Sequence, residues 1–301
     1  MFSVESVENN NLICNEQFGF RKNKSTELAL ISFVDRVMLA LDRSQLTAGV
    51  FCDLSRAFDC VDHRLLLKKL GVTGVKDKAL KLLESYLLDR FQRTIITENS
   101  RKFKSKWQKV LYGVPQGSIL GPTLFLIYIN DLPDVIKRCF TLFADDTNVL
   151  ITENSFINLS LSINNTLEEL TKWFKNNGLV INQEKTSIIH FKARNNAGND
   201  LSQTNSNVVH THKFLGVNID KNLNWKLHIE NLVKKLSTFR FAFKILFNTV
   251  SIETRKVVYY AYIDPILKYG ITVWGTSPNL NRVFLAQKCL IRVMMGVNYR
   301  A

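Results

Sequence analysis

Three carboxylates, each placed where a short apolar segment ends, are the residues of this chain best suited to chemistry. Asp145 and Asp146 stand side by side in LFADDTNVL, and Asp53 ends the apolar run GVFCD. At an effective dielectric constant near 20, two charges about 5 Å apart repel by roughly 3 kcal/mol. That repulsion is tolerated at a hydrated turn, where Asp is common for its own reasons. It is also tolerated where a cation lies between the charges.

The elements around these carboxylates are expected to bring them together. The runs TLFAD and NVLIT predict a hairpin with Asp145 and Asp146 at its tip, and GVFCD predicts a strand that ends at Asp53. If these strands are neighbours in one sheet, the carboxylates converge. Mg²⁺ prefers hard oxygen ligands, and two such ions about 4 Å apart hold the attacking and leaving oxygens of an in-line displacement. Asp53 and Asp145 would bridge the ions, and Asp146 would orient them.

The composition narrows the class of protein that carries these residues. The chain has 301 residues, of which 46% are hydrophobic, so we expect one large domain or two closely packed subdomains. Its formal net charge of +14 favours a polyanionic partner, either nucleic acid or an acidic membrane surface. The longest apolar run, residues 119–129, is too short to span a bilayer. Five scattered Cys without a CxxC pair predict reduced thiols, no zinc site and an intracellular location, in the nucleus or the cytoplasm.

Hydrophobic periodicity predicts an α+β fold with a sheet-bearing middle and a helical C-terminus. We expect a helix from Ser25 or Thr26 to Asp42 and a buried helix in SILGPTLFLIYINDL. LVINQEKTSIIHF predicts a pair of strands, and HKFLGVNID predicts one more. The remaining expected elements are two short helices on either side of Gly71–Gly74, strands in FQRTIIT and near 103–110, and a helix over 156–175.

Most of the positive charge lies in the helical C-terminus. Residues 221–301 hold 13 Lys and Arg against 3 acidic residues, a net charge of +10. The apolar residues of this region form one helical stripe and the lysines lie off it, which suits either a phosphate backbone or a simple solvated face. The stripe consists of Trp225, Ile229, Leu232, Leu236 and Phe243, and the candidate nucleic-acid-binding residues are Lys226, Lys234, Lys235 and Lys244.

Four segments, taken in order, resemble the motifs of reverse transcriptases. They are QFGFRKNKST (17–26), GVFCDLSRAFDCVDH (49–63), GVPQGSILGPTLF (113–125) and FADD (143–146). The late segments HKFLGVNID and YGITVWG, together with Ala144 in place of the retroviral Met, resemble the jockey-like non-LTR retrotransposons. The resemblance implies a right hand of fingers, palm and thumb with an antiparallel palm sheet. It divides the chain into partial fingers (1–46), a palm (47–220) with a finger insertion at about 64–110, and a thumb with a C-terminal extension (221–301).

The same resemblance implies a role for individual residues. Asp53, Asp145 and Asp146 would be the acidic triad that binds two Mg²⁺, with Mn²⁺ as a substitute, and Lys185 would help to protonate the departing pyrophosphate. Phe58 would lie beneath the sugar of the nucleotide, although a plain core position is an equally good interpretation of that residue. The other implied sites are nucleotide binding by Arg21, Gln116 and Gly117 and a primer grip at Phe214, Leu215 and Gly216. We interpret Asp62 as a helix cap and not as a metal ligand.

The expected function is that of an RNA-directed DNA polymerase core, acting on an RNA template, a DNA primer or target site, and dNTPs. Only sixteen residues precede Gln17, whereas the family normally has a further fingers segment there. We therefore expect an N-terminally truncated part of a longer mobile-element polyprotein. Two alternatives stay open: a catalytically silent nucleic-acid-binding remnant, and an RNA-dependent RNA polymerase. The sequence does not indicate the host, the target site or the oligomeric state.

Overall fold

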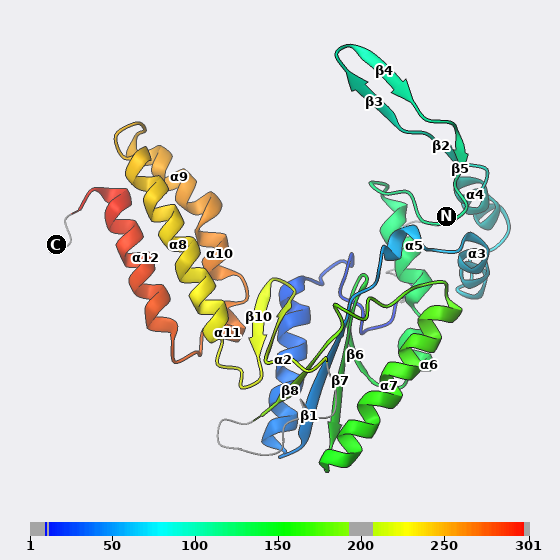
Figure 1. Ribbon diagram of the computed structural model, residues 1–301, viewed down its shortest axis with the longest axis horizontal. Coiled ribbons are helices and arrows are strands. Elements are labelled where there is room, and N and C mark those ends of the chain that lie inside the picture. The colour runs from blue at the N-terminus through cyan, green and yellow to red at the C-terminus, as the bar shows by residue number, and fades with distance from the viewer. Residues whose placement is uncertain (1–9, 11, 193–206, 298–301) are drawn as a thin grey trace. The chain divides into compact units, whose positions relative to one another are not determined.

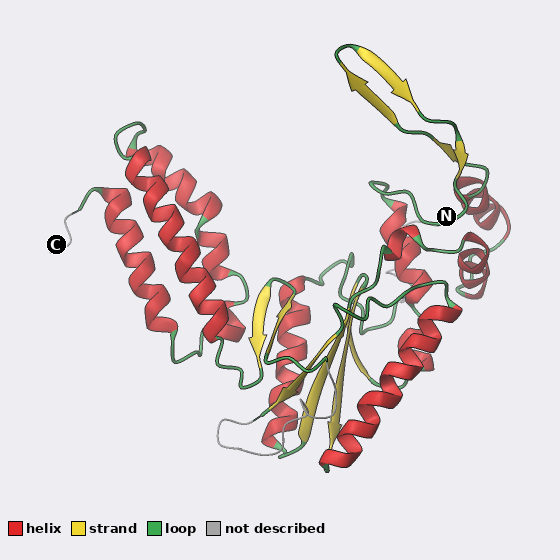
Figure 2. Ribbon diagram, in the orientation of Figure 1, coloured by secondary structure: helices red, strands yellow, loops and turns green. Residues whose placement is uncertain are grey.

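The structure is a computed structural model that describes residues 10, 12–192 and 207–297. Its contacts divide the chain into two compact units. The first contains residues 1–25, 50–151 and 157–187, and the second contains residues 26–49, 152–156 and 188–301. Figure 2 shows helices and strands in both units, as the predicted α+β class requires. The boundaries of fingers, palm and thumb remain a prediction.

The central sheet has the strand order β6-β7-β1-β8 (Figure 1). Its strands are β1 (Leu46–Cys52), β6 (Cys139–Phe143), β7 (Asp146–Glu153) and β8 (Ser187–Phe191). All but the first residue of β1 are buried, as expected of a continuous apolar run inside a sheet. Strands β6 and β7 form the expected antiparallel hairpin, closed by the pair Phe143 and Asp146. Because β1 lies beside β7, the residue that follows β1 lies near the tip of this hairpin.

The helices of the first unit differ in how much of their surface is buried. Helix α5 (Leu120–Ile129) has eight buried residues, which explains its nearly uniform apolar sequence. Helix α7 (Phe156–Asn176) buries one face only and ends before Gly178, whose φ of +66° is easily adopted without a side chain. Helix α3 (His63–Val72) is capped by Asp62, whose Oδ1 accepts a hydrogen bond from Leu65 N at 2.8 Å, so the interpretation of Asp62 is confirmed. Two further helices are α4 (Asp77–Leu87) and α6 (Leu132–Val135).

A long hairpin follows α4 and carries its strands in two separate pairs. Strand β2 (Phe91–Gln92) pairs with β5 (Gln108–Lys109), and β3 (Ile95–Glu98) pairs with β4 (Arg101–Lys104). The two strands predicted in this region are therefore present as one hairpin. Figure 2 shows no helix against β3 and β4.

The second unit combines α2 (Thr26–Asp42), a small hairpin and the C-terminal helices. The small hairpin pairs β9 (Thr211–Phe214) with β10 (Val217–Asp220). The predicted stripe on and just before α8 is buried at all five positions, and the four candidate lysines are exposed. The helices are α8 (Lys226–Leu246), α9 (Ile252–Tyr262), α10 (Asp264–Lys268), α11 (Ile271–Trp274) and α12 (Leu280–Met295).

Two strand predictions were wrong in detail. LVINQEKTSIIHF contains one strand, β8, because Asn182 to Thr186 form a turn in which Thr186 N and Oγ1 donate to Asn182 O, both at 2.9 Å. HKFLGVNID forms two strands instead of one. In the part of the chain that the structure describes, no helix is both long and apolar enough to cross a membrane.

Candidate active site

The structure brings the three predicted carboxylates into one electrostatic cluster. Partial burial, and after it repulsion from Asp53, raises the pKa of Asp145. Partial burial, followed by repulsion from Asp145 and Asp53, raises the pKa of Asp146 to about 6. Lys185 lies beside them, with its Nζ 3.1 Å from Oδ2 of Asp53. Four residues named from the sequence as catalytic therefore gather at one end of the central sheet.

The turn that carries Asp145 is strained and is held from outside the hairpin. Ala144 has a φ of +53°, in the left-handed region that residues with a Cβ disfavour. Its backbone N–H donates at 2.9 Å to Oε1 of Gln17, which also accepts from Gly19 N at 2.8 Å. A Cβ on Gly19 would lie 2.4 Å from Ala144 N, so only glycine allows this close approach. Gln17 is 1% exposed and acts as a clamp beneath the catalytic turn.

Replacing Gln17 with Leu is expected to destabilise the first unit and to lower activity. The change leaves two backbone N–H groups, those of Gly19 and Ala144, without an acceptor, and an unpaired buried donor costs about 1–3 kcal/mol. Since Gln17 Nε2 is itself buried without a partner, part of that loss is offset. We expect a net loss of about 1–3 kcal/mol, measured by urea unfolding, and a misplaced Asp145.

Gln17→Glu is the matched control for this prediction. It keeps an acceptor oxygen at the same place and replaces the amide group that has no partner with a second carboxyl oxygen, so its stability also includes the cost of a buried carboxyl group. The Glu variant should recover at least part of the stability that the Leu variant loses. Equal stability of the Leu variant and the wild type would show that the clamp does not support the turn.

Phe58 follows Asp53 by five positions, and its ring contacts two other rings. It belongs to a short 3-10 helix, Ala57–Asp59, that follows Asp53 closely. Its ring stacks on Phe125 with the centroids 4.3 Å apart, and Phe20 meets it edge-on at 6.4 Å. Phe125 is fully buried, whereas Phe58 is half-buried. The ring is thus packed against Phe125 on one side, and part of it reaches the surface. Its role beneath a sugar stays a prediction.

The predicted nucleotide-supporting turn lies against Asp59. Gln116 is exposed, and its Nε2 donates to Oδ1 of Asp59 at 2.8 Å. Gly117 has a φ of +76° and open space where a side chain would be. A cavity of about 540 Å³ adjoins this turn, with Gln116, Asp59 and His63 in its wall. Gln116 thus faces a space large enough for a small molecule.

Arg21 makes contacts that the sequence did not predict. Its Nη1 donates to the carbonyl oxygens of Cys14 at 2.7 Å and Gln17 at 3.4 Å, so in this structure the guanidinium braces the segment that contains the clamp. The role of Arg21 at a triphosphate stays a prediction.

The predicted primer grip is the turn between β9 and β10, in the second unit. The ring of Phe214 is 2% exposed and packs on Phe33 at 5.2 Å, so it anchors the hairpin. Leu215 and Gly216 form the turn, both with positive φ. Tyr269 supports it, because its hydroxyl donates to Leu215 O at 2.5 Å and its ring would lie 3.3 Å from a Cβ on Gly216. The backbone of the turn, more than the Phe214 ring, is the part that could touch a ligand.

The carboxylates have the chemistry of a site for a hard cation, although their positions do not form a closed one. Within residues 10, 12–192 and 207–297, no group of three or more His, Cys, Asp or Glu side chains is arranged to hold a metal ion. Asp53 is instead paired with Lys185. A cation between the carboxylates would relieve the repulsion that helps to raise the pKa of Asp145 and Asp146. The chemistry of the donor set therefore fits a divalent cation such as Mg²⁺, which prefers carboxylate oxygens.

Sequence reasoning missed Gln17, Asp59 and Tyr269 as supporting residues. The roles of Gln17 and Tyr269 depend on contacts with residues 127 and 54 positions away, which no local pattern encodes. The available signal was the glycine two residues after Gln17, which could have indicated a close backbone approach. Asp59 accepts a hydrogen bond from Gln116, 57 positions away, which no local pattern encodes either.

Proteins that resemble this chain in sequence match it over most of its length. The family described as reverse transcriptase (RNA-dependent DNA polymerase) matches residues 3–219. The RNA-directed DNA polymerase from mobile element jockey of Drosophila melanogaster is 28% identical over 93% of this chain and 32% of its own length. The probable RNA-directed DNA polymerase from transposon BS of the same organism is 27% identical over 96% of this chain and 33% of its own length. The chain thus spans about a third of the length of these curated relatives.

Solved structures show the same fold at low sequence identity. A telomerase from Candida albicans matches with a TM-score of 0.57 and 11% identity, over 99% of this chain and 56% of the telomerase. This likeness confirms the predicted right-hand polymerase fold. The relatives from mobile elements confirm the resemblance to jockey-like non-LTR retrotransposons. Since the family match covers well over half of its residues, the chain belongs to the reverse transcriptase family.

Proposed function

We propose that this chain is the polymerase core of a mobile-element protein that copies RNA into DNA, adding dNTPs to a primer 3′-hydroxyl. The convergence of Asp53, Asp145, Asp146 and Lys185 in one unit carries the proposal. Family membership supports it, because reverse transcriptases generally use divalent metal ions and Asp carboxylates are suitable ligands for them. The names of the curated relatives describe them as RNA-directed DNA polymerases.

The residues of this chain have distinct tasks in the proposed reaction. Asp53 and Asp145 would hold two Mg²⁺, which when bound neutralise charge on the attacking and leaving oxygens. Gln17 keeps the Asp145 turn in place. Phe58, whose ring packs on Phe125, would lie beneath the sugar of the nucleotide. Lys185 carries a proton on Nζ beside Asp53 and would give it to the departing pyrophosphate. Most of the rate enhancement would come from positioning and charge neutralisation.

Nucleic acid would be held by the positive charge. The lysines of α8 that the sequence singled out, Lys226, Lys234, Lys235 and Lys244, are exposed and free to meet phosphates of a primer–template. The net charge of +14 favours the same partner.

Primer extension tests the proposal directly. The purified chain would be mixed with a primer annealed to an RNA template, dNTPs and Mg²⁺, with EDTA as the control and rNTPs in a parallel reaction. We expect dNTP addition that stops with EDTA. RNA binding without extension would identify a silent nucleic-acid-binding remnant, and equal use of rNTPs would identify an RNA polymerase.

A further inference from the structure

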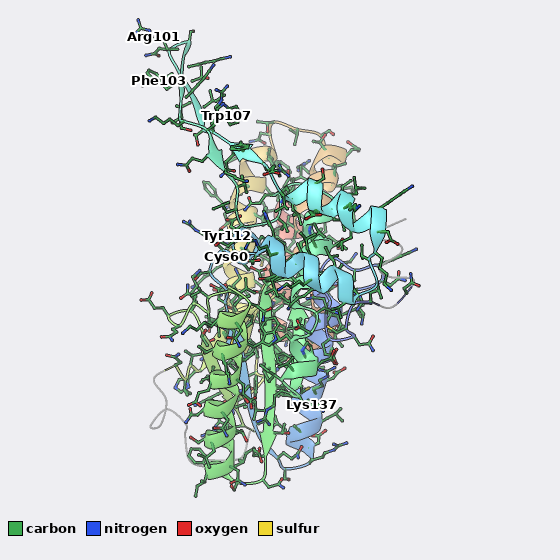
Figure 3. All side chains as sticks on the ribbon, turned by 90° about the vertical axis from the view of Figure 1, so that its right-hand side faces the viewer. Cys60, Arg101, Phe103, Trp107, Tyr112 and Lys137 are labelled. Carbon is green, nitrogen blue, oxygen red and sulfur yellow. The ribbon has the colours of Figure 1, made fainter. Side chains whose placement is uncertain are left out.

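The hairpin formed by Phe91–Lys109, hereafter the exposed hairpin, has no hydrophobic core of its own. In the fully described span 88–112, no residue is buried. Large apolar side chains of the hairpin are nevertheless exposed to solvent: Ile96 is 62% exposed, Phe103 56% and Trp107 60%. A two-stranded hairpin is marginally stable alone, so exposed rings on one require an explanation other than packing. Figure 3 shows Arg101, Phe103 and Trp107 on this hairpin as it projects from the first unit.

The exposed hairpin also concentrates positive charge. From Asp89 to Lys109 the sequence has seven Lys and Arg against two acidic residues, a net charge of +5. Both acids are matched within the hairpin, since Asp89 pairs with Lys109 at 2.7 Å and Glu98 lies opposite Arg101 in the strand register. The cations left for a ligand include Lys102, Lys104 and Lys106.

Rings and cations alternate along the second strand and the segment that follows it. Phe103, Lys104, Lys106 and Trp107 lie within five consecutive positions. Arg93 lies across from them, with its Cζ 4.5 Å from the centroid of the Trp107 ring. The register places Phe103 opposite Ile96, and Lys104 opposite Ile95 on the other face. Phe103 and Lys104 therefore lie on opposite faces of this short ribbon.

This combination fits unpaired nucleic acid better than a duplex or a protein. Phosphates meet the lysines, and only unstacked bases can lie on ring faces, because duplex bases are already stacked. A protein partner would favour a contiguous apolar surface, whereas here charged side chains separate the apolar ones. We propose that the exposed hairpin is a binding site for single-stranded RNA, with bases stacking on Trp107 and Phe103. The choice of RNA over DNA rests on the proposed function. The assignment of a stacking site rests only on the exposed rings and lysines of the hairpin.

Tryptophan fluorescence tests the site without any catalytic step. All four tryptophans lie in the described part of the chain. Trp173, Trp225 and Trp274 are 6%, 2% and 1% exposed, so Trp107 is the one that a ligand can reach. Titrating the full chain with oligouridine in EDTA should quench its fluorescence to a saturable limit. Trp107→Phe keeps a ring and should bind the RNA while losing the quench.

Two pairs of variants test the two parts of the site. One pair tests stacking on the Trp107 ring, and the other tests whether a lysine of the hairpin contributes more than an exposed lysine elsewhere. Trp107→Leu removes the ring, and the affinity for labelled oligouridine, followed by anisotropy, should fall at least about fivefold relative to Trp107→Phe. Lys104→Ala should reduce the slope of log affinity against log salt by about 0.7, the value for one phosphate contact on a single strand. Lys137→Ala is the matched control, because Lys137 is exposed and far from the exposed hairpin in Figure 3.

Each result decides the proposal. Quenching that survives Trp107→Phe, equal affinities of the Leu and Phe variants, or equal salt slopes of Lys104→Ala and Lys137→Ala would each overturn it. Tighter binding of an oligothymidine than of oligouridine would overturn the assignment to RNA. The titration contains EDTA and no nucleotide, so it does not depend on polymerase activity. A chain that is inactive in primer extension can still show the expected quenching, and a chain that is active can still lack it. A thermal unfolding curve for each variant should match the wild type, since the hairpin buries nothing.

Discussion

Asp145→Asn should abolish nucleotide incorporation and leave the fold at least as stable as before. The carboxylate is expected to be a metal ligand. Changing a residue that merely hydrogen-bonds to a metal ligand lowers activity roughly 10–100-fold, so the loss of the ligand itself should lower it further. Rates of primer extension at saturating Mg²⁺ measure this loss. Asp53→Asn should have the same effect on activity, since both residues belong to the same charged cluster.

The stability of Asp145→Asn has a distinct pH dependence. Asp146 has its pKa raised to about 6, partly by the charge of Asp145, so the two repel fully only above that pH, where Asp146 is ionised. At pH values above about 6, removing the Asp145 charge should therefore raise the thermal unfolding midpoint. This gain should shrink at lower pH, where Asp146 becomes protonated.

Asp134→Asn is the control for this pair of measurements. Asp134 is an exposed carboxylate on α6 in the same unit, so it tests loss of one negative charge away from the cluster. It should retain activity and show no gain in thermal midpoint. Full activity of Asp145→Asn would remove the basis for the two-metal assignment, and an unfolded variant would assign Asp145 a structural role instead.

Phe58→Ala should allow the enzyme to incorporate ribonucleotides. Phe125 fixes the ring from one side and Phe20 meets it edge-on, so the ring cannot easily move away from a 2′-hydroxyl. Closely packed surroundings relax only partly around an added atom. Since Phe58 is half-buried, we expect a stability loss below the roughly 3–5 kcal/mol of a fully buried Phe→Ala change. Some efficiency with dNTPs should also be lost with the packing.

Single-nucleotide extension with dNTP and rNTP in parallel measures the change in sugar choice. Phe58→Tyr is the matched control, because it keeps the ring and should still reject ribonucleotides. If Phe58→Ala rejects them as strongly as the wild type, Phe58 is simply a packing residue. If the wild type accepts both sugars equally, the RNA polymerase interpretation applies.

Local patterns predicted the elements that carry the site, and they failed where long-range contacts or side-chain hydrogen bonds decide the structure. The hairpin that carries Asp145 and Asp146 was predictable because two short apolar runs flank these residues within a few positions. The turn at Asn182 was mistaken for strand because Leu179, Val180 and Ile181 form a short apolar run just before it. The Asn182 side chain instead accepts a hydrogen bond from Lys185 N at 3.3 Å and favours a turn. The clamp by Gln17 and the rings around Phe58 join distant segments, so no single stretch encodes them.

The clamp at Gln17 also constrains the order in which the first unit can fold during synthesis. Gln17 is synthesised 127 positions before Ala144, the residue that it holds. At 5–20 residues per second, the ribosome reaches Ala144 roughly 6–25 s after it has added Gln17. During this interval the backbone N–H of Phe18 also lacks its acceptor, the carbonyl oxygen of Leu142 on the first strand of the hairpin. The catalytic turn therefore acquires its geometry late, and a nascent chain released early would carry the clamp without the carboxylates that it positions.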